Sequence, residues 1–429
     1  MLTRLQIINF RNIAMQQIDG LSVVNLFLGE NGAGKTSVLE AIHTLGHGRS
    51  FRKQGGQKDA LVSFGSDRLV VFGERDPTVV RGVDEGRPGV AERFGLSRAT
   101  NGEIQIKHNG EKLYRLSDIA LRLPMIALNA DTFELLTGAA SERRRYLDWA
   151  VFHVEHEFRE ASKRYLVALQ QRNAFLRQMA RTQNLKGRAQ EESYPLSEEQ
   201  KHQLSVWTDP LVEAGEQVAT LRARQFKVLN QLFCQVLGEL GGSGLGVKLI
   251  YRSGWSRGSC LSDALNHNLA SDLARGFTQF GPHRADVQVL VDNESSGQPR
   301  LARDVLSRGQ LKLIVLSMKL AQILFYLETT GGAVYDKTND DRGDRVDFGL
   351  QRAESREPLV LLLDDVAAEF DGLRLALLGK TLGGLLCRGG LQVFATATTK
   401  ELLERFLEGL SQSSLKVFHV EQGVLGASE

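Results

Sequence analysis

Short apolar runs, separated by polar and glycine-rich segments, predict a series of strands in the first part of the chain. Their valine, isoleucine, leucine and phenylalanine content is typical of strands, which bury one or both faces in a sheet. An Asn109-Gly110 pair directly after one run is a hairpin signal, because both residues accept positive φ. Residues 76–95 contain proline and glycine without a clear period, so we expect a loop there. The predicted strands are residues 4–10, the run that ends at Leu28, residues 68–74 and residues 103–108.

The apolar period becomes helical in the middle of the chain, from about residue 131 to 240. Between Leu147 and Leu169 apolar residues recur at steps of three and four, which predicts one long amphipathic helix. Residues 184–199 are polar and predict a connector, and residues 200–237 resume the helical period. The pattern predicts an antiparallel helical arm inserted into an α/β domain, with a seam far too short for a coiled-coil rod.

The last part of the chain returns to strands around one apolar helix. Residues 311–327 are apolar nearly all round, so they are expected to form a core helix. Residues 359–365 are five aliphatic residues followed by two acids, which is typical of a buried parallel strand that ends at a charged site. Residues 246–251 and 391–395 predict further strands, and residues 329–357 predict an exposed loop.

Composition restricts the class of protein without naming a partner. The 429 residues suffice for two to three domains, and 42% apolar with 24% charged residues is a globular balance. There is no uninterrupted apolar run long enough for a membrane span and no signal-peptide pattern, so a cytoplasmic location without membrane is expected. The net charge of +2 does not indicate a nucleic-acid binder, so any DNA contact requires locally clustered basic residues. Cys234, Cys260 and Cys387 form no metal pattern and are each expected to be buried.

Candidate chemistry begins at residues 29–36, which fit the phosphate-binding pattern G-x-x-x-x-G-K-[ST] between a predicted strand and a predicted helix. Three glycines are expected to supply positive φ, so that backbone N–H groups can surround phosphates. Lys35 is expected to reach the β- and γ-phosphates, and the Thr36 hydroxyl to bind Mg²⁺. The alternative is a glycine-rich turn that matches by chance. The predicted nucleotide contacts of this loop are Gly29, Glu30, Asn31, Gly32, Ala33, Gly34, Lys35, Thr36 and Ser37.

The two acids that follow the predicted strand at residues 359–363 are candidates for the second half of a nucleotide site. Asp364 is expected to hold Mg²⁺, and Asp365 to orient or deprotonate an attacking water, with Lys35 as the second catalytic candidate. The alternative is an ordinary strand followed by a helix cap.

Residues Leu306–Gln310 read L-S-R-G-Q and resemble the signature sequence of ABC-type ATPases. In that class the motif of one subunit contacts the nucleotide bound by the other, which implies an ATP-dependent homodimer with contacts from Ser307, Gly309 and Gln310. A helix N-terminus facing an anion is the physical basis of such a contact. The alternative is a plain helix cap by Ser307.

The chain as a whole resembles the RecF family, whose relatives are the Rad50 and SMC heads. The resemblance implies an α/β fold, an ABC-type P-loop ATPase head with an inserted helical arm as second lobe. The expected division is 1–125 for the N-terminal half of the ATPase lobe, 126–245 for the arm and 246–429 for the C-terminal half. The resemblance to the RecF family rests on the three nucleotide motifs and on four further segments. These are Asn9-Phe10-Arg11-Asn12, Gly48-Arg49-Ser50-Phe51-Arg52, the segment from Arg143 to Asp148, and Gly281-Pro282-His283-Arg284.

What the resemblance implies is a protein of DNA replication and recombinational repair that acts as an ATP-gated clamp. Two subunits would close over two ATP molecules with Mg²⁺ and bind double-stranded DNA and junctions with single-stranded gaps. Such proteins help to load RecA together with RecR and RecO, and slow, weak ATP hydrolysis resets them. A structural or signalling ABC-type protein without a DNA role and a transporter subunit remain the alternatives.

Further residues receive roles from the same resemblance. Arg11 is expected either to touch the nucleotide phosphates or to form a surface ion pair. The switch histidine of ABC ATPases is missing, and Thr396 could substitute for it; Asn129 is a candidate for the Q-loop glutamine. The DNA-binding candidates, with a solvated charged surface as the alternative, are Arg49, Arg52, Lys53, Arg143, Arg144 and Arg145.

Overall fold

The computed structural model shows two compact units, Met1–Phe133 with Leu327–Glu429, and Glu134–Tyr326. The structure describes residues 1–52, 61–76, 91–182, 197–292, 298–330, 357–410 and 414–427. The boundaries of these units differ from the expected division at 125 and 245. Residues 246–326 group with the helical arm, whereas they were expected in the C-terminal half of the ATPase lobe. The segment 246–326 includes the strands that pack beside the arm and most of the core helix. Each unit is described below by itself.

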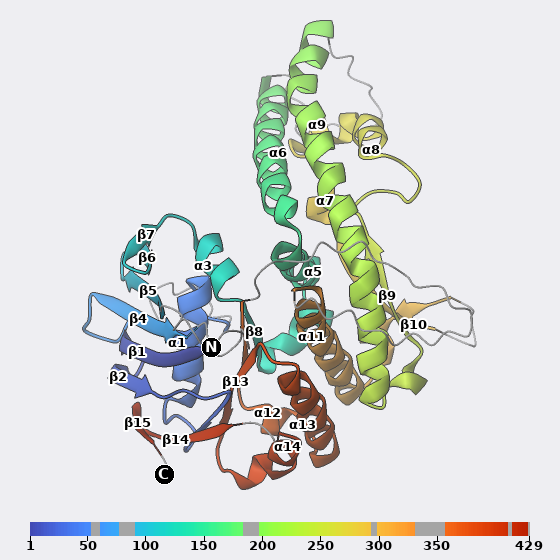
Figure 1. Ribbon diagram of the computed structural model, residues 1–429. Coiled ribbons are helices and arrows are strands. Elements are labelled where there is room, and N and C mark those ends of the chain that lie inside the picture. The colour runs from blue at the N-terminus through green and yellow to red at the C-terminus, as the bar shows by residue number, and fades with distance from the viewer. Residues whose placement is uncertain are drawn as a thin grey trace, which may run out of the picture. The chain divides into compact units, whose positions relative to one another are not determined.

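The first unit contains an antiparallel sheet of six strands in the order β2-β1-β4-β5-β6-β7 (Figure 1). The hairpin between β6 and β7 turns at Asn109 and Gly110, with φ values of 50° and 85°, as the sequence predicts. The strands are β1 (Leu2–Phe10), β2 (Ile13–Asp19), β4 (Arg68–Arg75), β5 (Glu92–Ala99), β6 (Ile104–His108) and β7 (Glu111–Leu113).

A second sheet of the first unit positions the candidate site. Its order is β15-β14-β3-β13-β12-β8, and all neighbours are parallel except the hairpin of β14 and β15. All residues of β3, β12 and β13 are buried, which explains their continuous apolar sequence. Because these three strands are parallel neighbours, the residues after each of them meet at one edge of the sheet. The strands are β3 (Val24–Leu28), β8 (Met125–Leu128), β12 (Leu359–Leu363), β13 (Leu391–Ala397), β14 (Leu415–Glu421) and β15 (Val424–Ala427).

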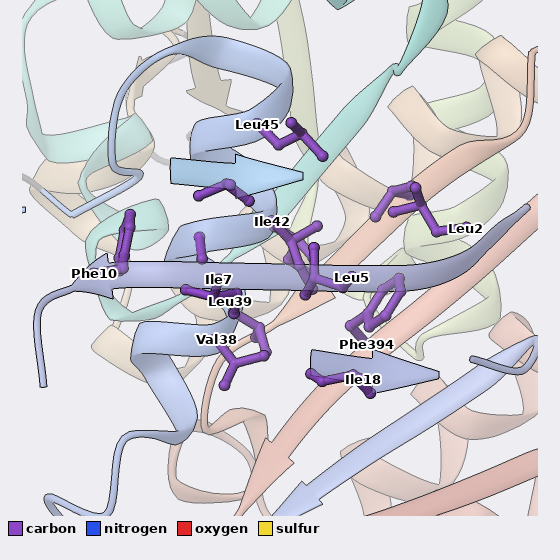
Figure 2. Close-up of a cluster of buried hydrophobic side chains, with 14 of the residues drawn as sticks. Leu2, Leu5, Ile7, Phe10, Ile18, Val38, Leu39, Ile42, Leu45 and Phe394 are labelled. Atoms are coloured by element: carbon purple, nitrogen blue, oxygen red, sulfur yellow. The ribbon is translucent and has the colours of Figure 1, made fainter. Parts of the chain in front are cut away.

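Helix α1 (Lys35–His47) lies in the core of the first unit, where almost every one of its residues is buried. Figure 2 shows Val38, Leu39 and Ile42 of α1 packed with Leu5 of β1 and Phe394 of β13, so the helix is held between strands of both sheets. The loop before α1 is therefore anchored on a rigid support. The other helices of this unit are α3 (Leu116–Arg122), η1 (Ala130–Phe133), α12 (Val366–Glu369), α13 (Gly372–Cys387), η4 (Glu401–Leu403) and α14 (Glu404–Glu408).

The second unit is built on two long helices, α6 (His156–Thr182) and α7 (Glu198–Glu239), which run side by side (Figure 1). The pair is antiparallel, because Arg164 bonds Gln217 whereas Arg172 bonds Thr208. A capping box of Ser197 and Gln200 starts α7. This confirms the predicted helical arm. The other elements are α4 (Glu134–Thr137), α5 (Ala140–Val154), η2 (Ser243–Leu245), β9 (Val247–Arg252), α8 (Leu261–His267), α9 (Leu269–Arg275), η3 (Pro282–Arg284), β10 (Asp286–Val291), β11 (Arg300–Leu301), α10 (Ala302–Val305) and α11 (Arg308–Thr330), whose last residues belong to the first unit.

Helix α11 is the predicted core helix. Its segment Arg308–Thr329 is long and apolar enough to cross a membrane, but 78% of its most apolar window is buried inside the protein. Buried hydrogen bonds fix it, since the Tyr146 hydroxyl donates to the carbonyl of Met318 at 3.0 Å and Gln322 donates to the carbonyl of Tyr146 at 2.9 Å. A mostly buried apolar helix behaves as the centre of a protein core.

Three predictions about local structure are wrong. The long helix from Leu147 breaks at Glu155, which is extended and whose carboxylate accepts a bond from Arg224 at 2.9 Å. The apolar period continues across Glu155, so the sequence pattern does not indicate the break in the helix. Strand β5 begins at Glu92, inside the expected loop, of which residues 77–90 lie outside the described part. Cys234, Cys260 and Cys387 are all exposed rather than buried.

Candidate nucleotide-binding site

The glycine-rich loop connects β3 to the N-terminus of α1. Gly32 and Gly34 have φ values of 84° and 111°, as expected, and no side chain caps the helix at Gly34. The first N–H groups of a helix have no acceptor within it, so this end of α1 suits an anion. Gly29 does not need positive φ, contrary to the prediction. An added Cβ at Gly29 would lie 2.2 Å from the Val420 carbonyl oxygen, so a side chain there is excluded by the close approach of β14.

Lys35 is folded back onto the loop that precedes it. Its Nζ donates to the carbonyls of Gly29 at 2.6 Å and Glu30 at 2.8 Å, and the residue is only 7% exposed. Burial lowers the pKa of Lys35, and the nearby carboxylates of Asp365 and Asp364 act in the opposite direction. The ammonium group is thus held where the loop would surround a phosphate.

Asp364, at the carboxyl end of β12, is the centre of the polar contacts. Its Oδ1 accepts from the hydroxyls of Thr36 at 2.8 Å and Thr396 at 3.0 Å, and its Oδ2 lies 3.4 Å from the Arg52 guanidinium. Burial raises the pKa of Asp364, and the donated bonds and Arg52 oppose that shift. Thr396 lies near the end of β13 and Thr36 follows β3, so the parallel sheet brings the three oxygens together.

These groups fit a magnesium nucleotide. Thr36 and Asp364 offer a hydroxyl and a carboxylate in direct contact, and Mg²⁺ prefers one or two such oxygens with the remainder from phosphate and water. No cluster of three acidic, histidine or cysteine side chains occurs in the part of the chain that the structure describes, so a site made by protein ligands alone is not indicated there. When bound, the ion would neutralise phosphate charge, while the loop N–H groups and Lys35 would position the phosphates.

Asp365 follows directly and is in a strained conformation. Its φ is 51° and its ψ is 42°, a left-handed geometry that few residues other than glycine, asparagine and aspartate adopt. The Asp365 N–H donates to the Thr396 hydroxyl at 2.8 Å. Thr396 is buried and uses its hydroxyl for both acids, so in this structure it positions Asp364 and Asp365. Strain of this kind is common at functional sites.

The segment after β1 supports the start of α1. Arg11 forms a bidentate ion pair with Glu40, with both N···O distances at 2.7 Å, and Glu40 is fully buried. Asn12 accepts from the Ser37 hydroxyl at 2.8 Å. The ion pair foreseen for Arg11 therefore exists, but it is internal rather than on the surface. Its contact with phosphates stays a prediction.

Two supports of the loop were missed in the sequence. Glu40 could have been noticed, because a carboxylate on the apolar face of a helix needs a cationic partner. The turn before β15 could not have been noticed, because it is distant in sequence from the loop. Its Gly423 N–H donates to the Ala33 carbonyl at 2.7 Å. The side-chain oxygen of Asn129, the candidate for the Q-loop glutamine, accepts from Thr132, at 3.1 Å from the N–H and 2.7 Å from the hydroxyl. The Q-loop role of Asn129 stays a prediction.

The basic candidates of the first unit differ in their surroundings. Arg49 is exposed, and its carbonyl is bonded to His43. Arg52 lies beside Asp364 and so belongs to the candidate nucleotide site. Lys53 lies outside the described residues. A DNA contact by Arg49 or Arg52 stays a prediction.

The three arginines at the start of α5 have three different environments. Arg143 is buried and bidentate to Asp286 at 2.8 and 3.1 Å, and it also donates to the Gly138 carbonyl. Its proposed DNA contact is therefore corrected to an internal link between α5 and β10. Arg144 is partly buried and bonded to the Ala285 carbonyl at 2.7 Å, and burial lowers its pKa. Arg145 is exposed beside Glu142, so it alone keeps the character of a surface cation.

The signature-like segment begins helix α11 in the second unit. The Ser307 hydroxyl accepts from the Gln310 N–H at 3.3 Å, and the Gln310 side chain accepts from the Ser307 N–H at 2.9 Å. This is a capping box, so the alternative of a helix cap is present in the structure. Ser307 is also exposed, and Gly309 lies in the first turn. Ser307 can therefore cap α11 and still be exposed to an anion at the N-terminus of this helix.

Asp364→Asn is expected to stabilise the nucleotide-free protein while weakening magnesium binding. Because the pKa of Asp364 is raised in the folded protein, folding favours the neutral carboxyl. The stability that this group contributes is therefore lost as pH rises through its folded pKa, and its charged form destabilises the fold at neutral pH. Asparagine keeps an oxygen that can accept from both threonines. A rise of about 1–3 °C in the melting temperature at pH 7 is expected, with the gain disappearing at acidic pH. A lower melting temperature at pH 7 would contradict this.

The fold and this site define a P-loop ATPase head of the kind found in SMC proteins, with a short helical arm. The chain matches the RecF/RecN/SMC N terminal domain family over residues 1–425. It is 32% identical to the DNA replication and repair protein RecF of Teredinibacter turnerae, over 98% of this chain and 95% of that protein. It is also 32% identical to the RecF protein of Hahella chejuensis, over 99% and 98%. The chain belongs to the RecF family.

Solved structures agree with this assignment. A structure described as the recombination mediator protein RecF with ATP in the RecFOR pathway has a TM-score of 0.72 and 25% identity, covering 100% of this chain and 97% of the other. The SMC head domain of Pyrococcus furiosus has a TM-score of 0.52 and 12% identity, covering 100% and 95%. The second similarity concerns the fold alone. The predicted fold class, an ABC-type head with an inserted helical arm, is confirmed.

Proposed function

We propose that this protein is an ATP-gated, dimeric DNA clamp of DNA replication and recombinational repair. The observation that carries the proposal is the direct contact of Thr36 with Asp364 beside the uncapped end of α1, an arrangement that suits one protomer's share of a magnesium triphosphate site. The names and the ATP complex of the RecF relatives support the same reading.

The clamp would close when two copies each contribute their loop to one ATP and their Ser307–Gln310 segment to the other. ATP stabilises the closed dimer only by contacts that the open form lacks, so DNA affinity follows the nucleotide state. Asp365 and Lys35 would support a slow hydrolysis that resets the dimer. The bound DNA would be double-stranded or a junction with a single-stranded gap, and the partners would be RecR and RecO in the loading of RecA, in the cytoplasm.

A second candidate is an ABC-type ATPase with a structural or signalling role. The net charge of +2 and the internal ion pair of Arg143 favour it, because both reduce the basic surface available to DNA. A local basic surface formed on dimerisation distinguishes the two, and only a binding measurement reveals it.

Fluorescence anisotropy of a labelled duplex with ATP, ADP and no nucleotide tests the clamp. We expect at least about tenfold higher affinity with ATP, and a steep loss with salt. Asp365→Asn should keep the left-handed turn, since asparagine tolerates it, bind ATP and hold the DNA without turnover. Equal affinity in the three nucleotide states would remove ATP gating, and full turnover in Asp365→Asn would remove the role of Asp365.

A further inference from the structure

A groove of about 590 Å³ in the second unit combines cationic and aromatic side chains. Its walls include Arg252, Arg275 and Arg284, all exposed, and the half-buried rings of Trp255, Phe277 and Phe280. None of the described residues that line it carries a carboxylate. The volume is within the range of pockets that hold small ligands.

Two glycines fix the shape of this groove. The Gly281 N–H donates to the Gly254 carbonyl at 3.2 Å, so two chain segments touch through their backbones. An added Cβ at Gly254 would lie 2.1 Å from the Gly281 carbonyl oxygen, and the φ of Gly254 is 103°. The loop that carries Trp255 is thereby held against the start of η3. The Trp255 Nε1 donates to the Ser259 carbonyl at 3.1 Å, which fixes the indole ring.

The residues of the motif Gly281-Pro282-His283-Arg284 divide into supporting residues and one exposed cation, Arg284. His283 Nε2 lies 3.1 Å from the Thr278 carbonyl, which can only accept, so Nδ1 accepts from the Tyr165 hydroxyl at 2.6 Å. Burial lowers the pKa of His283 to about 4, and the ring is neutral. The Pro282 carbonyl accepts from Arg222. Arg284 is exposed, with its guanidinium 5.7 Å from the centre of the Phe277 ring.

The three groove arginines differ from most arginines of the helical arm in their charged neighbours. No carboxylate among the described residues forms an ion pair with Arg252, Arg275 or Arg284, although most arginines of the arm have one. Unneutralised guanidinium groups beside aromatic faces are the combination that binds phosphates together with bases. In a duplex the bases are stacked on each other, so their faces are not available to such rings.

We propose that this groove binds an unpaired stretch of a DNA strand, with a base stacked on the aromatic side chains and flanking phosphates on the three arginines. The inference deepens the proposed function, on which its biological role rests, by assigning the single-stranded side of a gap junction to a defined surface of one protomer. Binding to the groove itself needs neither ATP nor a second copy.

Tryptophan fluorescence with two strands of equal length, an oligodeoxythymidylate and its abasic counterpart, tests the groove without nucleotide. We expect quenching by the thymidylate strand and about tenfold weaker binding of the abasic strand, because the abasic strand has no bases to stack on the aromatic side chains. Trp255→Phe should keep binding, measured by anisotropy, but lose most of the quenching. Equal binding of both strands would overturn the proposal, since charge alone would then explain it.

The variant Arg284→Ala provides a second, independent test of the groove. It should weaken the thymidylate strand about three- to tenfold and make its binding less dependent on salt, while Lys227→Ala, an exposed cation of α7 outside the groove, should change neither. Unchanged binding in Arg284→Ala would overturn the inference even if duplex binding remains ATP-gated. If strands bind as expected but duplex affinity ignores ATP, the groove stands and the clamp proposal fails.

Discussion

Lys35→Ala is expected to lower the affinity for ATP by about 10- to 150-fold, because a hydrogen bond from the ammonium to a charged phosphate oxygen would contribute about 1.5–3 kcal/mol. The same Nζ donates to the carbonyls of Gly29 and Glu30 at 2.6 and 2.8 Å. The variant therefore loses both a ligand contact and a support of the loop. Isothermal titration calorimetry with magnesium ATP measures the effect, and the ATP-dependent dimer should disappear with it.

Asp365→Asn is the matched control for Lys35→Ala. It also removes a charge from the site, but the asparagine fits the left-handed conformation and leaves the ammonium in place. We expect it to bind ATP with affinity close to that of the natural protein. A Lys35→Ala protein that binds ATP equally well would mean that the loop amides alone hold the phosphates, and that the role given to Lys35 is wrong.

The chemistry of the first unit could be predicted because it depends on neighbours in sequence. A glycine-rich loop after a strand, and two acids after five aliphatic residues, each specify their own local structure. The continuous apolar character of β3, β13 and β12 is typical of parallel strands that are buried on both faces. Their observed register brings Thr36, Thr396 and Asp364 together.

What could not be predicted depends on partners that are distant in sequence. Gly29 is required by the passage of Val420, almost at the other end of the chain. Glu155 ends α5 while accepting bonds from α7, yet the apolar period continues through it. The sequence carries no local signal for either contact.

The arginines at 143–145 differ in burial, and the helical period of the sequence indicates this difference. Arg143 precedes Tyr146 by three residues and Leu147 by four, so a helical period places it on the buried face with them. Arg145 falls on the opposite side and is exposed. The three arginines do not form one basic cluster, because the rotation of about 100° per residue separates consecutive side chains on a helix.

Ser307→Asp is expected to abolish the ATP-dependent dimer without harming the monomer. Aspartate is as good an N-cap as serine, so the start of α11 keeps its cap, unlike in Ser307→Arg, which removes the cap and adds bulk. If Ser307 of one protomer faces the triphosphate held by its partner, the new carboxylate is repelled by it. Like charges brought together at an interface cost several kcal/mol, which corresponds to a loss of about 100-fold or more in dimer affinity.

Sedimentation velocity with magnesium ATP distinguishes the two roles of Ser307. We expect a dimer for the natural protein and for Ser307→Thr, which keeps the cap and the hydroxyl, and a monomer for Ser307→Asp and Ser307→Arg. ATP affinity of the monomer and the melting temperature of Ser307→Asp should stay within error of the natural protein, because the cap survives and the P-loop is untouched. Should Ser307→Asp dimerise normally, Ser307 is only the helix cap that its bonds with Gln310 describe, and the closure of the clamp must depend on other residues.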